Sequence, residues 1–205
     1  MDIMIVGAGN MGRGIATRIL AAGHPVHITD QDIQAAQKLA ADLNDDATGA
    51  LFEGPEDAHV VILALPYPAN VNVATEWAQE LAGKVVVDIA NPVDFDTMDA
   101  LVTRGAESSA EEVAGAAPAA RVVKAFNTTF ATTLIKDEPL DLFVAGNDDA
   151  ACETVADLVR DARMRPIRVG HLKHARSLEG MQLLAMKVQQ QIGGGFTTRL
   201  SLQEG

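Results

Sequence analysis

Three glycines near the start of the chain have the spacing of a phosphate-binding loop. Gly7, Gly9 and Gly12 form a Gly-x-Gly-x-x-Gly pattern directly after a short apolar run. In such a loop the first glycine makes a tight turn, the second lets a pyrophosphate approach the backbone, and the third brings the next helix close to the strand. The start of that helix offers unpaired N–H groups to the phosphates. The pattern predicts a dinucleotide site, with Asn10 and Met11 in the same loop.

An acidic residue stands where such a site would hold the adenosine ribose. The second predicted strand, residues 25–29, is followed by Asp30. A carboxylate there accepts hydrogen bonds from both ribose hydroxyls of NAD, and it repels the 2′-phosphate of NADP. We therefore assign Thr29 and Asp30 to the cofactor site and expect NAD(H) to be favoured over NADP(H). Arg13, in the helix after the glycine loop, is the cation that could offset this repulsion.

Further candidates come from the ends of later strands. Asn127 and Thr128 follow a predicted strand at its carboxyl end, where ligands bind in open parallel sheets, although both could instead cap the next turn. Asn91 is also assigned to the cofactor site, with turn formation as its alternative. His171 and His174 precede the last long helix, beside the region that a second substrate would use, and we expect them to be the histidines worth testing.

Other reactive side chains have structural interpretations. His24, His27 and His59 are expected to be structural or on the surface. Lys124 lies within a predicted strand, where a packed stem with an amine that reaches solvent is favoured over catalysis. Cys152 is the single cysteine, which excludes internal disulfides and cysteine-clustered metal sites, and it is expected to be a small buried thiol. We assign no catalytic residue and no metal ligand.

Apolar runs alternate with helical patterns along the chain, which predicts an α/β fold. The sheet is expected to be doubly wound and mostly parallel, the Rossmann arrangement for NAD(P) binding. Predicted strands lie near residues 3–6, 25–29, 47–50, 59–65, 84–89, 121–125, 140–145 and 166–169. Predicted helices start after the glycine loop and span about 31–43, 69–81, 108–114, 148–162 and 174–192. The carboxyl ends of the strands would bring Leu65, Pro66 and Tyr67 beside the glycine loop.

The chain is expected to form one domain, residues 1–205, with a core of 1–170 and a C-terminal helix and tail of 171–205. The tail around 196–202 is predicted to be a strand or a docking arm. Its 205 residues carry a net charge of −12, and 48% of them are hydrophobic. No apolar run approaches the length of a membrane span. So acidic a body makes nucleic acid an unexpected partner, and a cytoplasmic location is expected.

Charge is distributed unevenly between the two ends of the chain. Residues 1–159 hold 8 basic and 25 acidic side chains, whereas residues 160–205 hold 8 basic and 3 acidic ones. The basic end is interpreted as a solvated surface, a subunit contact with the acidic body, or a landing site for an anionic ligand. We expect a homodimer.

Six motifs occur in order along the chain: 5–12, Leu65-Pro66-Tyr67, Asp88 through Pro92, Val122 through Thr128, Ala145 through Asp148, and Ala175-Arg176-x-Leu178-Glu179. By these motifs the chain resembles the NADP-dependent oxidoreductases that use the deazaflavin coenzyme F-420. It also resembles the dinucleotide-binding domain of pyrroline-5-carboxylate reductases and beta-hydroxyacid dehydrogenases. The Lys-Ala-Phe-Asn-Thr and Ala-Arg-x-Leu-Glu elements are the motifs that make this resemblance specific, since many families share the glycine loop. The resemblance implies that Pro66 and Tyr67 pack near the ribose and nicotinamide, and that Phe126, Asn127, Thr128 and Thr129 line the hydride-transfer cleft.

The chain departs from this family at one position. Members that take NADP usually carry a Ser/Thr-Arg pair after the second strand, and the arginine pairs with the 2′-phosphate. Here the pair is Thr29-Asp30, followed by Gln31. The departure again favours NAD.

Three functions are compatible with these features. The first is an NAD(P)H-dependent oxidoreductase that passes a hydride to a planar acceptor such as a deazaflavin or flavin, which needs stacked rings more than an acid or base. The second is a non-catalytic redox sensor that binds the dinucleotide. The third is a beta-hydroxyacid dehydrogenase or imine reductase, which is less favoured because that class needs a further helical domain and about 30 residues follow His174.

Overall fold

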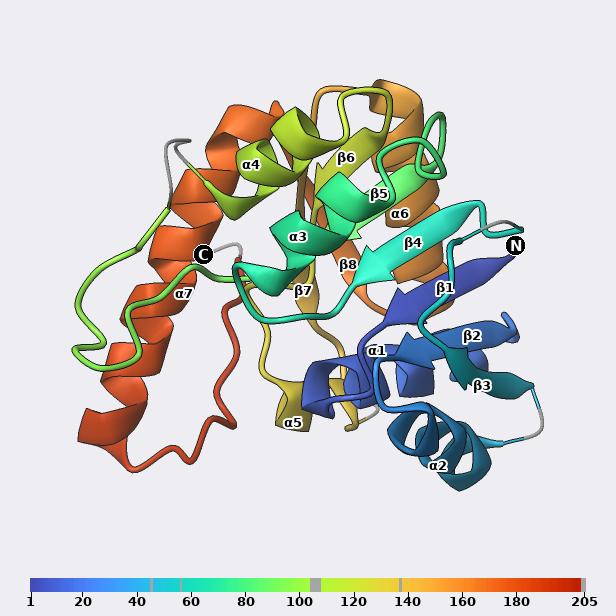
Figure 1. Cartoon of the computed structure of the whole chain (residues 1–205). Coiled ribbons are helices and arrows are strands. Elements are labelled where there is room, and N and C mark those ends of the chain that lie inside the picture. The colour runs from blue at the N-terminus through green and yellow to red at the C-terminus, as the bar shows by residue number, and fades with distance from the viewer. Residues whose placement is uncertain (45, 56, 104–107, 137, 204–205) are drawn as a thin grey trace.

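Eight strands form a single sheet in the order β3-β2-β1-β4-β5-β6-β7-β8 (Figure 1). The computed structural model describes residues 1–44, 46–55, 57–103, 108–136 and 138–203. The strands are β1 Ile3–Val6, β2 Val26–Asp30, β3 Ala47–Leu51, β4 Val60–Leu63, β5 Val85–Asp88, β6 Arg121–Lys124, β7 Asp141–Gly146 and β8 Arg165–Gly170. All eight agree with the predicted positions to within about two residues, the usual uncertainty of strand and helix ends.

Helices cover both faces of the sheet, so the doubly wound α/β fold is confirmed. They are α1 Asn10–Ala21, α2 Ile33–Leu43, α3 Ala69–Glu76, α4 Ser109–Ala116, α5 Ala131–Leu134, α6 Asp149–Asp161, the 3-10 turn η1 Leu172–His174, and α7 Ala175–Ile192. One apolar core holds side chains of α1, α2 and α6 against one face, and a second core holds those of α3, α4 and the start of α7 against the other. Strand residues alternate between the two cores, as expected for a sheet buried on both sides.

The last two strands run against the rest of the sheet. Strands β1 to β6 are mutually parallel, but β7 pairs with β6 in the antiparallel sense, and β8 is parallel to β7. The carboxyl end of β8 therefore lies beside the amino ends of β1 to β6, at the opposite end of the strands from the glycine loop. Helix α7 follows η1 and lies along one side of the molecule beside α4 (Figure 1), where Leu178 and Met181 pack against Phe143 and Ala145 of β7.

The tail after α7 is a docking arm and not a strand. Gly193 ends the helix in the left-handed conformation, with φ of 64°. The ring of Phe196 meets Phe130 edge to face at 5.4 Å, and the Leu202 N–H donates to Asp141 at 2.6 Å. These contacts return the chain to the outer strands. Among the described residues, no helix has the length and apolar character needed to cross a bilayer.

Candidate functional site

The glycine loop has the geometry that its spacing predicts. Gly7 adopts φ of +115°, and a Cβ on it would lie 2.6 Å from the Ala64 carbonyl oxygen. A Cβ on Gly12 would lie 2.0 Å from the Gly7 carbonyl oxygen, so this glycine permits the close contact of helix and strand. A Cβ on Gly9 would meet nothing within 4 Å. The open space at Gly9 is the approach that a pyrophosphate needs.

Helix α1 begins directly at this open space. Gly9 is its N-cap and has no side chain to bond the first-turn N–H groups, and the first turn carries no acidic residue. In contrast, the side chains of Asp32 and Asp148 cap α2 and α6. The N–H groups at the start of α1 are therefore available to an anionic ligand, as the loop predicts.

Asp30 lies at the end of β2 with its carboxylate against the glycine loop. The Ala8 N–H donates to Asp30 Oδ2 at 2.8 Å, and the Asp32 N–H donates to Oδ1 at 3.0 Å. Because a carboxylate can accept about four hydrogen bonds, acceptor capacity remains for a ribose. The side chain borders a hollow of about 170 Å³ whose lining also includes Phe52 and Glu76. No lysine or arginine is among the lining residues that the described chain contributes.

Thr29 and Arg13 are engaged elsewhere. Thr29 is fully buried, and its hydroxyl donates to the Leu51 carbonyl oxygen at 2.7 Å, so its side chain joins β2 to β3 and is not free for a ligand. Arg13 pairs with Asp42 of α2 at 2.8 Å. The cation that could have balanced a 2′-phosphate beside Asp30 thus already has a carboxylate partner.

A cleft of about 330 Å³ opens beside the glycine loop, at the carboxyl ends of β1, β4 and β5. It brings together seven residues predicted for the site: Gly9, Asn10, Met11, Leu65, Pro66, Tyr67 and Asn91. The sequence interpretation missed the other five lining residues, which are Ala64, Ile89, Ala90, Phe95 and Met186. Met186 belongs to α7, so the C-terminal helix contributes one side chain to the wall of this cleft. Nothing in the sequence distinguishes Met186 from the other apolar residues of this helix.

Behind the cleft, Asn91 and Asn127 join the turns that follow β5 and β6. Asn127 Nδ2 donates to Asn91 Oδ1 at 2.9 Å, and Asn91 Nδ2 donates to the Asn127 carbonyl oxygen at 3.0 Å. Phe126 is fully buried in the core in the left-handed conformation, with φ of 60°, and it does not line the cleft. Thr128 is also buried, and its Oγ1 has no hydrogen-bond partner among the described residues.

Known proteins combine this fold with this loop. The family model for coenzyme F420-dependent NADP oxidoreductases matches residues 2–92. The F420-dependent NADP reductase of Methanocaldococcus jannaschii is 32% identical over 199 residues, which cover 88% of this chain and 89% of that relative. The chain belongs to the F420-dependent NADP reductase family.

Two further relatives show how far the likeness extends. A solved structure from Arthrobacter sp. FB24 superposes with a TM-score of 0.83 at 26% identity, covering 98% of this chain and 100% of the other. Metalloreductase STEAP3 of Rattus norvegicus is 28% identical over 182 residues, or 87% of this chain. The match spans 36% of the length of the rat protein.

Three of the motifs typical of this reductase family meet at one buried side chain. Lys124 Nζ donates to Asp88 Oδ2 and to Glu179 Oε1, each at 2.7 Å, and to the Ala90 carbonyl oxygen. The side chains of Lys124, Asp88 and Glu179 are all fully buried. The expectation that this amine reaches solvent is therefore wrong, because two carboxylates and a carbonyl oxygen replace water around it.

Neighbouring polar groups complete this buried cluster. Asn70 of α3 donates to Asp88 and, at 2.9 Å, to Ser109 Oγ, while the Ser109 N–H donates to Glu179 Oε1 at 3.1 Å. Burial raises the pKa of Glu179 from its ordinary 4.5 to about 7, although Lys124 opposes this rise.

The two C-terminal histidines do not line the cleft beside the glycine loop. His171 and His174 follow β8, whose carboxyl end lies at the opposite end of the strands because β7 and β8 are reversed. Leu172, between them, lines a hollow with Arg121 and Val122 at the start of β6. Strand direction therefore keeps these histidines away from the cleft beside the glycine loop, where the sequence interpretation expected them to join the site.

The remaining reactive side chains lie outside the cleft. His24 contacts Asp161 at 2.9 Å, His27 contacts Thr48 at 2.7 Å, and His59 contacts Asp2 at 3.1 Å. Cys152 is 1% exposed, and burial raises the pKa of its thiol, as expected for an inert cysteine. No group of three or more His, Cys, Asp or Glu side chains suited to a metal ion occurs in the part of the chain that the structure describes.

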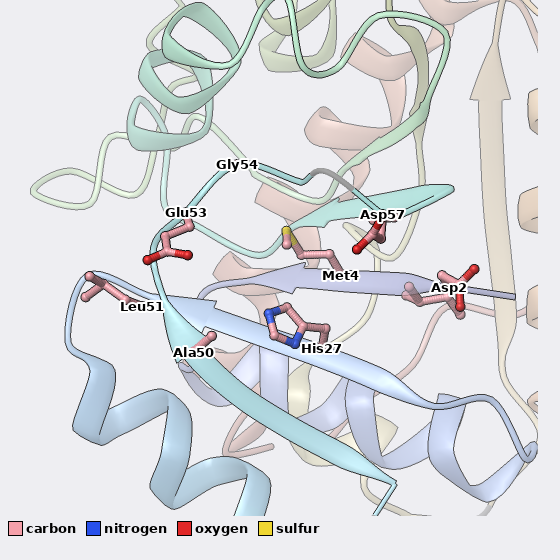
Figure 2. A pocket seen from close by; sticks show the side chains of 10 residues that line it. Asp2, Met4, His27, Ala50, Leu51, Glu53, Gly54 and Asp57 are labelled. Carbon is pink, nitrogen blue, oxygen red and sulfur yellow. The ribbon is translucent and has the colours of Figure 1, made fainter.

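A larger hollow of about 410 Å³ lies away from the cleft beside the glycine loop. Figure 2 shows Met4 and His27 on the same face of β1 and β2, beneath the connection that carries Glu53 and Gly54. The hollow exists because the described residues between β3 and β4 form no helix, which leaves this part of the sheet face partly uncovered. It shares no lining residue with the cleft beside the glycine loop.

Proposed function

We propose that the chain transfers a hydride between a nicotinamide dinucleotide and coenzyme F420. The observation that best supports this function is the open space at Gly9. It continues from the start of α1 into the cleft that the ends of three strands and α7 line. The family membership supplies the substrate class, since the archaeal relatives are named F420-dependent NADP reductases.

The lining of the cleft supports transfer between two flat rings. Leu65, Ile89, Phe95 and Met186 provide apolar surface against which rings can stack and from which water is displaced. The dinucleotide and the deazaflavin supply the redox chemistry, and the protein's part is to hold the two rings close and correctly oriented. This is consistent with our assignment of no acid or base.

We also propose that NADH is preferred to NADPH, unlike in the relatives by name. Asp30 and Glu76 both border the hollow beside the ribose position, and Arg13 is bonded to Asp42. A 2′-phosphate of about −2 charge would face these carboxylates, and like charges at short range repel strongly even after solvent screening. The ribose hydroxyls of NADH would instead donate to Asp30.

Turnover with a panel of acceptors tests the function. Purified protein should oxidise NADH in the presence of F420, followed by the loss of absorbance of the reduced nicotinamide, with FAD and FMN as alternative acceptors. Binding of NADH without turnover of any acceptor would favour the non-catalytic redox sensor, and turnover of imines or hydroxyacids alone would favour the dehydrogenase class.

The exposed surface of α7 supports the proposal of a homodimer. Leu184, Val188 and Ile192 are spaced four residues apart on one side of the helix and are 64%, 43% and 57% exposed. A second copy is the occupant that we propose for this strip, since the helix belongs to the basic end of an otherwise acidic chain. A cytoplasmic location is part of the same proposal, in keeping with the single cysteine.

A further inference from the structure

Behind the cleft wall, one buried ammonium group holds three separate elements together. We propose that Lys124 is a positioning residue which, through Asp88 and Glu179, fixes the Ile89–Asn91 wall of the cleft and helix α7 in the arrangement that receives the acceptor ring. This inference rests on the proposed function for its substrate. Its geometry does not depend on that function.

The contacts of Lys124 account for all of its donors. An ammonium has three N–H groups, and here they reach Asp88 at the end of β5, the Ala90 carbonyl oxygen in the wall, and Glu179 in α7. Each bond has a charged donor and is shielded from water, and such bonds are stronger than neutral ones at the surface. Removing the ammonium would therefore release all three elements together.

Two of these three elements, the wall after β5 and helix α7, contribute residues to the cleft. Ile89, Ala90 and Asn91 line it directly, and Met186 lines it from α7, about two helical turns beyond Glu179. The opposite side, with the glycine loop and Asp30, makes no contact with Lys124 among those that the structure describes. Lys124 should therefore affect the acceptor and leave the adenosine half of the nucleotide unaffected.

Charge at Glu179 makes this arrangement sensitive to pH. The charged groups that face Glu179 are Lys124 of β6 and Asp88 of β5, and α4 presents the Ser109 N–H. The carboxylates of α4 are engaged elsewhere, Glu111 with Ser108 and Glu112 with Tyr67.

Burial favours the protonated form of Glu179, and its pKa in the docked helix is about 7. Docking of α7 is then strongest below the ordinary pKa of 4.5 and weakens as pH rises to about 7. The acceptor KM should accordingly rise across this range of pH.

The first experiment compares Lys124→Met with Lys173→Met, an exposed lysine in η1. We expect Lys124→Met to raise the acceptor KM by about tenfold or more while the affinity for ADP-ribose stays unchanged by calorimetry. Hydrogen exchange should quicken in residues 89–91 and in α7. If Lys124→Met fails to fold, the double variant Lys124→Met with Glu179→Gln takes its place in the comparison. The second change removes the carboxylate that the loss of the ammonium would leave buried without its cation.

The second experiment uses Glu179→Gln, which keeps the shape and hydrogen-bonding capacity but cannot ionise. Its acceptor KM should be flat between pH 4.5 and about 7, the range over which docking of α7 weakens, whereas that of the wild type rises. Glu80→Gln, at an exposed site, should retain the pH dependence of the wild type.

Two outcomes would overturn the positioning role. One is a folded Lys124→Met variant with wild-type exchange in the wall and helix and an unchanged acceptor KM. The other is equal loss of ADP-ribose and acceptor affinity, which would indicate a general structural defect. If the wild type reduces no F420, the proposed function fails, and the exchange measurements still decide whether Lys124 fixes the wall.

Discussion

Asp30 is the residue on which the choice of nucleotide should depend. We expect kcat/KM for NADH to exceed that for NADPH by about tenfold or more, which corresponds to about 1.4 kcal/mol. The paired change Asp30→Arg with Gln31→Arg should reverse the preference, because it replaces a carboxylate that repels the 2′-phosphate by guanidinium groups that pair with it. Asp57→Arg, in the separate hollow of Figure 2, is the control for added positive charge. A wild type that favours NADPH would contradict this assignment of Asp30.

Gly9 offers a substitution that separates binding from folding. Gly9→Val should abolish NADH binding, since its side chain would fill the pyrophosphate approach, yet the fold should survive because a Cβ there meets nothing within 4 Å. Gly115→Ala, at an open position in α4, is the control. Calorimetry for affinity and circular dichroism for folding are the measurements. Undiminished affinity in folded Gly9→Val would remove this loop from the site.

The difference between glycine and lysine shows what a sequence reveals at this scale. The roles of Gly7, Gly9 and Gly12 follow from the backbone of one turn, so their spacing predicted them, although the Ala64 carbonyl oxygen beside Gly7 comes from a distant segment. The partners of Lys124 lie 36 and 55 residues away, and no local pattern announces them. An isolated lysine in an apolar strand therefore suggested a surface amine, although the family motifs already contained all three members of the cluster.

At the scale of elements, the C-terminal arm should stabilise the fold. Asp141 accepts two bonds from Arg165 and one from the Leu202 N–H. Truncation at Gly193 should cost about 2 kcal/mol and lower Tm by about 4–8 °C. Thermal unfolding of the truncated and complete chains measures this loss of stability. Equal Tm values would show that the arm does not stabilise the fold.

The arm's main anchor also has a defined pH range. The Arg165 guanidinium lowers the pKa of Asp141 below its ordinary value of 3.8. A lowered pKa means that this contribution to stability is present above pH 3.8 and is lost as pH falls through the depressed pKa. Asp141→Asn should therefore reproduce part of the truncation effect at neutral pH and have less effect in strong acid.

The positions of the strands could be predicted from the sequence, but their direction could not. A strand pattern in the sequence does not show which way the strand points, so β7 and β8 were placed correctly without any sign that they are reversed. That reversal carried His171 and His174 to the far end of the strands. Helix α7 begins beside these histidines and is 18 residues long, which lets Met186 in its later turns reach the cleft.

At the scale of the whole molecule, the apolar strip on α7 should control assembly. Replacing Leu184 and Val188 by glutamine should shift the protein from dimer to monomer. Because both side chains are already exposed within one chain, the only loss of Tm should be the part that the dimer interface contributes. Sedimentation velocity over a range of concentrations measures this shift. A wild type that stays monomeric at high concentration would contradict the dimer proposal.

The packing of Cys152 against β7 gives the protein a built-in chemical reporter. This single thiol is 1% exposed, and a Cβ on Gly146 would lie 2.5 Å from its Sγ. A thiol-specific reagent can therefore reach it only when α6 separates from the strand reversal between β6 and β7. At low reagent concentration, the labelling rate would follow the population of molecules open at this junction. Comparing that rate with and without bound dinucleotide would show whether loading the distant glycine loop stabilises the reversed half of the sheet.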